Sequence, residues 1–151
     1  MKVLLTGSSK GIGHKIAEDL LAEGHQLALH YNKNKSPLEA LLKKDKTGSF
    51  SIQADLSNKD EIKKMVVNTI DKLSFPDCII NNAGIAESAD ISLDINSWSN
   101  MFDKTIDVNL KAPTLIFKEF LKYKRDKKIN SRLRIINIAS RAAFRGEQQD
   151  Y

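Results

Sequence analysis

The sequence predicts an α/β fold in which a doubly wound parallel sheet carries helices on both faces. Two observations favour this fold. Short apolar runs alternate with helical patterns along the chain, and a glycine-rich turn joins the first run to the first helix. Alternating strands and helices form the crossover units from which parallel sheets are built. With 151 residues, the chain suits one domain around one core.

Five apolar runs are predicted to be strands, because each is short and is bounded by polar or glycine residues. They cover residues 3–6, 26–31, 48–54, 77–81 and 133–139. Parallel strands bind ligands beyond their carboxyl ends, so the residues that follow each run are the candidates for a site.

Four helices are predicted between these strands. The second covers residues 36–44, with Ser36 as its N-cap and Pro37 at the first helical position. The fourth is one long helix over residues 97–123. The first helix ends at Gly24. Apolar residues recur at helical spacing in the first and third helices: Ile12, Ile16, Leu20, Leu21, Ile62, Val66, Ile70 and Leu73.

Composition excludes several classes of protein. Cys78 is the only cysteine, so neither an internal disulfide nor a cysteine metal cluster can form. We expect a buried, inert thiol. His14, His25 and His30 lack the spacing of metal ligands, and no metal site or catalytic histidine is predicted. Without a signal peptide or a long apolar segment, the protein is expected to be cytoplasmic, with no membrane partner.

The formal net charge of +5 is concentrated in residues 122–134, where seven basic residues stand against the single acid Asp126. A short basic connection between a helix and a strand is typical of a solvated surface. The run has no interleaved aromatic residues apart from Tyr123. No nucleic-acid partner is predicted.

The first turn reads Thr6-Gly-Ser-Ser-Lys-Gly-Ile-Gly13 and leads directly into the first helix. Glycines let a backbone approach a pyrophosphate closely, and a helix N-terminus offers amide donors. Ile12 occupies the place where a nucleotide-triphosphatase loop needs its second glycine, so that chemistry is disfavoured. Tight packing between strand and helix is the alternative explanation of the glycines.

Two further motifs follow later strands: Asn81-Asn-Ala-Gly84 and Asn137-Ile-Ala-Ser140. A third, Val108-Asn-Leu110, lies within the predicted long helix. Together with the glycine turn, they make the chain resemble the short-chain dehydrogenase/reductase family, in particular the 3-oxoacyl-acyl-carrier-protein reductases and similar carbonyl reductases. The resemblance spans essentially all residues. It implies that residues 1–151 form a single NAD(P)-binding Rossmann domain, incomplete at its C-terminus after the fifth strand.

The resemblance also implies roles for individual residues. Glycine-turn residues would surround the adenosine phosphates, Asp55 and Leu56 would meet the adenine ring, and Asn82 to Gly84 would line the ribose. The predicted cofactor residues are Gly7, Ser9, Lys10, Gly11, Ile12, Gly13, Tyr31, Asn32, Lys33, Asp55, Leu56, Asn82, Ala83 and Gly84. Asp55 has a structural alternative, because it is also placed to cap the following helix.

Ser140, Asn109 and Tyr151 are the catalytic candidates implied by the resemblance. Ser140 would hydrogen-bond the substrate carbonyl, and Asn109 would support a proton relay through its main chain. Tyr151 follows Ser140 by 11 residues, slightly fewer than is usual for the family tyrosine, so both a general acid and an unrelated tyrosine remain open. Alternatively, Ser140 ends a strand and Asn109 is a buried residue at a helix kink.

Cofactor preference is predicted from charge. NAD-preferring relatives carry an acid at the end of the second strand, which would repel a 2′-phosphate. Residues 29–35 contain no acid, while Lys10 and Lys33 offer positive charge. We therefore expect NADP, with NAD as the alternative if these lysines are ordinary surface cations.

The expected function is that of an NADP-dependent oxidoreductase acting on a small carbonyl or alcohol substrate, including one linked to acyl carrier protein. A longer, homo-oligomeric parent protein is expected to carry the activity, since the family lysine follows the tyrosine and is not within residues 1–151. The alternative is a catalytically silent dinucleotide-binding or regulatory module.

Overall fold

The computed structural model describes residues 1–87 and 90–140, which form one parallel sheet in the order β3-β2-β1-β4-β5. Every neighbouring pair of strands is parallel. The predicted doubly wound parallel sheet is therefore confirmed. The strands are β1 (Lys2–Leu5), β2 (Gln26–Tyr31), β3 (Phe50–Gln53), β4 (Cys78–Asn81) and β5 (Arg134–Asn137).

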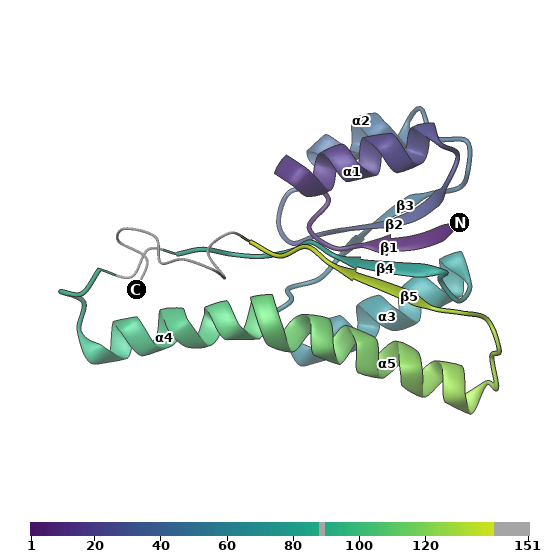
Figure 1. Cartoon of the computed structure of the whole chain (residues 1–151). Helices are drawn as coiled ribbons and strands as arrows, with labels where there is room; N and C mark the ends of the chain where they lie inside the picture. The colour runs from purple at the N-terminus through teal and green to yellow at the C-terminus, as the bar shows by residue number, and fades with distance from the viewer. Residues whose placement is uncertain (88–89, 141–151) are drawn as a thin grey trace.

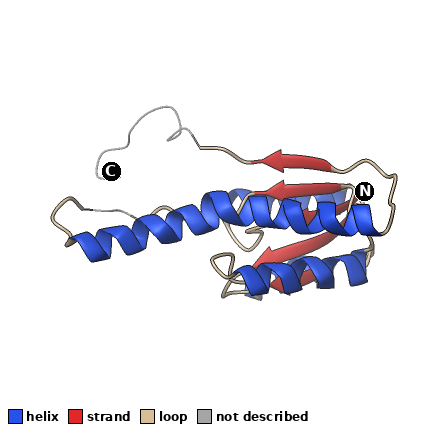
Figure 2. Ribbon diagram, turned by 90° about the horizontal axis from the view of Figure 1, so that it is seen from below, coloured by secondary structure: helices blue, strands red, loops and turns tan. Residues whose placement is uncertain are grey.

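Helices cover both faces of this sheet (Figure 1). On one face lie α1 (Gly11–Ala22) and α2 (Ser36–Leu42), and on the other lie α3 (Lys59–Leu73) and α5 (Ala112–Asp126). The helix α4 (Ile95–Ile106) joins α5 through a π-helical turn, η1 (Asp107–Lys111). Seen from below, α4 and α5 form one continuous rod that extends past the strand ends (Figure 2).

The core has two parts because successive residues of each strand point to opposite faces. On β1, Leu4 faces the layer of α3 and α5, whereas Val3 and Leu5 face the layer of α1. All three are fully buried. The predicted apolar face of α3, which includes Ile62 and Val66, is also buried.

The predicted strands agree with the structure to within a few residues. The largest differences are of two residues: β3 begins at Phe50 rather than at residue 48, and β5 ends at Asn137 rather than at residue 139. Gly48 has a φ of 81°, and the preceding turn is held by the Asp45 carboxylate, which accepts from the amides of Thr47 and Ser49. This turn chemistry keeps residues 48 and 49 out of the ladder.

The single helix predicted over residues 97–123 is wrong in its middle, where η1 interrupts it. Pro113 supplies the physical reason, because proline has no N–H to donate to the carbonyl of Asn109, four residues earlier. The backbone widens instead, and the amide of Ala112 bonds the Asp107 carbonyl, five residues back. Such π-helical turns are often found at functional sites.

The N-terminus of α2 also differs from its prediction, since Ser36 is the first helical residue rather than the cap. The Asn34 side chain accepts a hydrogen bond from the Ser36 amide at 3.0 Å. Lys35 occupies the N-cap position without a side-chain capping bond, and the Asn34 side chain holds the turn before it.

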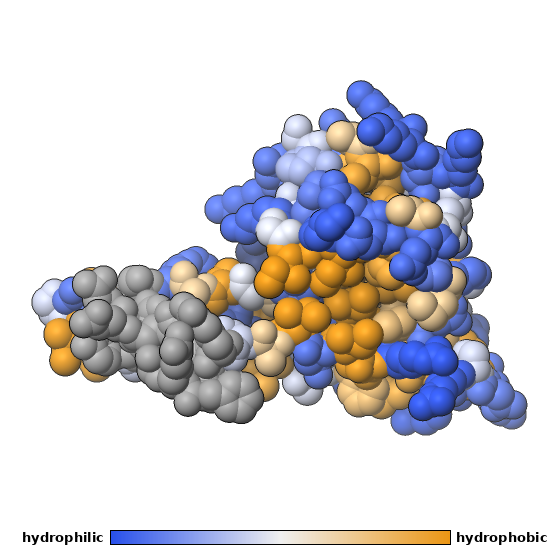
Figure 3. Space-filling view, turned by 45° about the horizontal axis from the view of Figure 1, so that its top comes forward, coloured by the Kyte–Doolittle hydropathy of each residue, from blue (hydrophilic) through white to orange (hydrophobic). Residues whose placement is uncertain are grey.

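β5 is the outermost described strand on its side of the sheet, and its apolar residues are poorly covered. Ile136 is 46% exposed and Ile138 is 38% exposed. Figure 3 shows an apolar area in the middle of that view, bordered by polar side chains.

The predicted buried thiol is confirmed, since Cys78 on the neighbouring strand is 4% exposed and burial raises the pKa of its thiol.

Within residues 1–87 and 90–140, none of the helices combines the length and the apolar character that crossing a membrane requires.

The packing of α5 on the sheet is tested by replacing Phe120, which is fully buried and meets Phe75 edge to face at 6.1 Å. We expect Phe120→Ala to lower the free energy of unfolding by about 3–5 kcal/mol because it leaves a cavity. Phe117→Ala, on the 37% exposed side of the same helix, should cost about 1 kcal/mol or less. Urea unfolding measures both, and equal losses would contradict the packing described.

Candidate functional site

Apart from Asn109 and Tyr151, the predicted site residues lie at or after the carboxyl ends of the five strands, which meet at one edge of the parallel sheet. The glycine turn follows β1, Tyr31 ends β2 with residues 32 and 33 after it, and Asp55 follows β3. Asn82 to Gly84 follow β4, and Ser140 follows β5. The strand order reverses between β1 and β4, and a crevice at such a switch point is where ligands bind in sheets of this type.

The glycine turn is in contact with the residues after β4. A Cβ atom on Gly13 would lie 2.2 Å from the Gly7 carbonyl oxygen and 2.3 Å from Asn82 Nδ2. A Cβ on Gly7, whose φ is 66°, would lie 2.7 Å from the Ala83 Cα. Both positions therefore require glycine, and the turn can approach the β4 end only without side chains. The packing explanation left open for the glycines is correct for Gly7 and Gly13, and it does not compete with a binding role.

Thr6 and Asn82 fix this contact with hydrogen bonds. The Thr6 hydroxyl accepts from the amides of Asn82 and Ala83, each at 3.0 Å. The Asn82 side-chain amide donates to the carbonyls of Thr6 and Gly7, also at 3.0 Å. The predicted site residues Gly7, Asn82 and Ala83 are thus brought together by one network.

The N-terminus of α1 opens toward the same edge. Lys10 is its N-cap, in extended conformation, and provides no side-chain cap. The amides of the first helical turn have no intrahelical partner, which leaves them available to an anion. Ile12, which the sequence places both at helical spacing and among the cofactor residues, is 65% exposed in the first turn of α1.

His30 makes contacts here that no sequence pattern signalled. It is 2% exposed. Its Nδ1 accepts from the Gly7 amide at 3.0 Å, and its Nε2 donates to the Ala54 carbonyl at 3.0 Å. Burial lowers the pKa of the imidazole, while the bond to Ala54 and the Asp55 carboxylate oppose that shift. The Gly7 N–H also disfavours protonation, because a protonated Nδ1 cannot accept.

The end of β2 presents the residues predicted to choose the cofactor. Tyr31 is half-buried, whereas Asn32 and Lys33 are exposed, as is Lys10. Gln53 donates to the Asn32 carbonyl at 3.2 Å and holds this turn against β3. The Asp55 carboxylate, after β3, interacts electrostatically with both Lys33 and His30.

Asp55 does not cap α3, so the structural alternative weighed for it is wrong. Its carboxylate accepts from the amide and the hydroxyl of Ser57, at 2.9 and 2.8 Å. These two bonds hold the pKa of Asp55 below its ordinary value. Asn58 caps the helix instead, accepting from the amides of Asp60 and Glu61.

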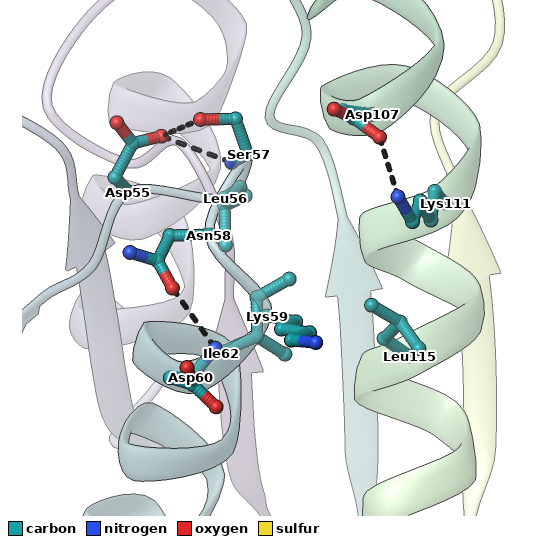
Figure 4. Close-up of a pocket in the computed structure, with 10 residues that line it drawn as sticks. All are labelled: Asp55, Leu56, Ser57, Asn58, Lys59, Asp60, Ile62, Asp107, Lys111 and Leu115. Carbon is teal, nitrogen blue, oxygen red and sulfur yellow. Dashed lines mark hydrogen bonds and ion pairs between the residues drawn. The ribbon is translucent and has the colours of Figure 1, made fainter.

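A hollow of about 410 Å³ lies between the start of α3 and η1 (Figure 4). It includes Asp55 and Leu56, but none of the glycine turn and none of residues 82–84. The predicted site residues therefore do not converge on it. Its lining consists of Asp55, Leu56, Ser57, Asn58, Lys59, Asp60, Ile62, Asp107, Lys111 and Leu115.

Asn109 lies in the π-helical turn, with an exposed side chain that contacts the loop after β4. Its amide group donates to the Ile85 carbonyl at 2.8 Å and accepts from the Ile85 amide at 2.9 Å. The alternative described Asn109 as a buried residue at a helix kink. The helix is irregular at Asn109, as that alternative expects, but the side chain is exposed rather than buried. Asn109 positions the chain next to Gly84.

Ser140 is exposed and lies three residues beyond the last residue of β5, so it does not end that strand. Below it, Asn81 donates to Asn137 across β4 and β5 at 2.8 Å. The structure thus carries Ser140 to the same sheet edge as Asn109 and Asn82. Tyr151 lies outside the described residues.

A parallel sheet with a glycine turn at its switch point defines a dinucleotide-binding type of α/β protein. The model of one family, described as short chain dehydrogenase, matches residues 1–150. The chain belongs to the short-chain dehydrogenase family.

Curated relatives of the chain include reductases of acyl-carrier-protein-linked substrates. It is 36% identical over 112 residues to 3-oxoacyl-[acyl-carrier-protein] reductase FabG of Staphylococcus epidermidis, covering 72% of this chain and 45% of that protein. It is 31% identical over 147 residues to 3-oxoacyl-[acyl-carrier-protein] reductase of Synechocystis sp., covering 95% and 57%. The chain spans about half the length of the curated relatives it matches.

Solved structures share this fold. A 4-hydroxyisoleucine dehydrogenase complexed with NADH superposes with a TM-score of 0.78 at 29% identity, over 98% of this chain and 59% of its own. A blue fluorescent protein from a metagenomic library, in complex with NADPH, gives 0.80 at 27% identity, over 97% and 58%.

The contact between α1 and the β4 end is tested by adding one methyl group. We expect Gly13→Ala to lower the free energy of unfolding by about 3 kcal/mol, since backbone atoms must move to admit it. Gly11→Ala is the matched control, because its Cβ meets nothing within 4 Å and only its φ of 55° is unfavourable. That control should cost about 1 kcal/mol. Similar losses in urea unfolding would refute the close approach.

The environment of His30 predicts how stability depends on pH. In the unfolded chain His30 binds a proton near pH 6.5, whereas the folded His30, with its lowered pKa, stays neutral there. The contribution of His30 to the free energy of unfolding is therefore fully present above pH 6.5. It falls below that pH by up to about 1.4 kcal/mol per pH unit. Urea unfolding from pH 5 to 8 measures this. His30→Gln should remove this component and His14→Gln should keep it; an unchanged profile in His30→Gln would contradict the assignment.

Proposed function

We propose that this chain binds NADP at the carboxyl edge of its sheet and serves an oxidoreductase that acts on a carbonyl or alcohol substrate. The observation that carries the proposal is the contact of the glycine turn with residues 82–84 at the strand switch point. Family membership supports it, and so do the nicotinamide dinucleotides in two structural neighbours.

The proposed arrangement follows the strand ends. Residues 7–13 receive the phosphates, because the first amides of α1 and the missing side chains of Gly7 and Gly13 leave room and donors for them. Tyr31, Asn32, Asp55 and Leu56 receive the adenosine end. Asn82 to Gly84 receive the ribose on the other side of the turn.

Preference for NADP over NAD rests on charge. Lys10, at the N-cap of α1, and Lys33, just after β2, are exposed where a 2′-phosphate is proposed to lie. No acid in residues 29–35 would repel that phosphate or bind the 2′-hydroxyl in its place. NAD is the alternative cofactor for this site.

For the reaction, the bound nicotinamide supplies hydride chemistry, and the protein supplies orientation and a proton path. Ser140 is proposed to hydrogen-bond the substrate oxygen. Asn109 is proposed to support proton transfer through its main chain, in the π-helical turn that Pro113 imposes. Tyr151 is the proposed proton donor within this chain.

The substrate class is proposed from the relatives. The reductases of S. epidermidis and Synechocystis are named for acyl-carrier-protein-linked substrates, so such a substrate is proposed here as well. A homo-oligomeric protein is proposed from family membership. A cytoplasmic location is proposed from the sequence, and no nucleic-acid or membrane partner is proposed.

Nucleotide titration tests the cofactor. We expect the chain to bind NADPH more tightly than NADH, and Lys10→Glu to weaken NADPH binding about tenfold while changing NADH binding little, because charge repulsion acts on the 2′-phosphate. Lys46→Glu makes the same charge change in an exposed loop beside β3's start and should leave both affinities unaltered. Nucleotide fluorescence measures the six affinities, those of the wild type and the two variants for NADPH and NADH.

If the chain binds neither NADPH nor NADH, the proposed function is wrong. NADPH oxidation with a generic ketone, followed by absorbance, separates an enzyme from a silent binding module: turnover supports the first, and binding without turnover supports the second.

A further inference from the structure

From its place in β2, His30 connects two loops at the carboxyl edge of the sheet, although it belongs to none of the motifs of the site. Its ring bonds Gly7 in the turn after β1 and Ala54 after β3. Its carbonyl accepts from both the amide and the hydroxyl of Ser8, each at 2.9 Å. Ser8 is fully buried, so these bonds are shielded from water.

The two ring contacts specify one form of the imidazole. The Gly7 amide is a donor, so Nδ1 must carry a lone pair; the Ala54 carbonyl is an acceptor, so Nε2 must carry the proton. Only the neutral Nε2–H tautomer satisfies both partners. A charged ring would turn two donors, Nδ1–H and the Gly7 N–H, toward each other.

These bonds hold the glycine turn from the side opposite Asn82. The Gly7 amide is fixed by His30, and the Gly7 carbonyl is fixed by the Asn82 side chain at 3.0 Å. The peptides on both sides of Gly7 are therefore locked in orientation. On the other side of the ring, Ala54 immediately precedes Asp55, which is proposed to meet the adenine.

We propose that His30 is a positioning residue for dinucleotide binding, whose neutral Nε2–H ring holds the phosphate-binding turn at Gly7 in register with the adenosine-binding loop at Ala54. The inference rests on the proposed function, because it assigns the partners of His30 to the two ends of one ligand. It adds a residue that touches the binding turn through the Gly7 backbone and needs no contact with the nucleotide.

Replacement of His30 tests the inference in the full chain with NADPH as the probe. His30→Leu introduces an apolar side chain of similar size and leaves the Gly7 amide without its acceptor. We expect NADPH binding to weaken on the order of tenfold. His30→Gln provides both an acceptor and a donor and should recover most of the affinity. Ile116→Ala, a buried residue of α5, controls for lost stability and should bind as the wild type does.

A spectroscopic readout separates positioning from simple packing. In ¹⁵N-labelled protein, the His30 ring nitrogens should report one neutral Nε2–H tautomer. Exchange of the Gly7 amide with solvent deuterium should be slow in the wild type and in His30→Gln, and at least about tenfold faster in His30→Leu, because the donor loses its acceptor.

The outcomes distinguish the two proposals. If the wild type binds NADPH and His30→Leu binds it equally well, the inference is overturned and the proposed function stands. If the wild type binds no nicotinamide nucleotide, the proposed function fails, and with it the link between His30 and a ligand. An Nδ1–H tautomer or a rapidly exchanging Gly7 amide in the wild type would also overturn the inference.

Discussion

The approach of α1 to the end of β4 is the constraint on which the rest of the site depends. Gly13 has no space for even one methyl group between the Gly7 carbonyl and the Asn82 amide. Because Asn82 also bonds the Thr6 carbonyl, the helix start, the glycine turn and the β4 end form one rigid unit. Relaxing it would displace the first amides of α1, which are the donors that an anion at this edge requires.

Around this unit, the sheet arranges polar groups of different chemistry along one edge. The half made of β1, β2 and β3 presents the glycine turn, the lysines of residues 29–35, a segment whose sequence has no acid, and Asp55. The half made of β4 and β5 presents the residues after Asn81, and Ser140. Asn109 enters from the helix layer and secures the β4 loop through Ile85. In the proposed function, the first half binds the nucleotide and the second half places polar groups beside the substrate. Such a division is expected for a dinucleotide-dependent enzyme.

Most of the fold could be predicted from the sequence because its strands are short apolar runs and its turns carry glycines and asparagines with few alternative roles. The prediction of one helix over residues 97–123 is wrong because apolar periodicity continues across Pro113. The missing N–H of proline nevertheless breaks the regular hydrogen bonding of the backbone there. His30 could not be recognised, because a buried histidine in an apolar strand has no local signature. Its partners, Gly7 and Ala54, lie 23 and 24 residues away, and only the tertiary structure brings them together.

The same long-range bonds have a consequence for synthesis on the ribosome. The Asn82 amide joins Thr6 and Gly7 across 76 and 75 residues of sequence. The glycine turn is made first, yet it cannot reach its final conformation until β4 has emerged and inserted beside β1. Because contacts of such separation form late, the nascent chain carries an unfinished glycine turn through the synthesis of three strand–helix units, and the proposed nucleotide cannot assist folding before that point.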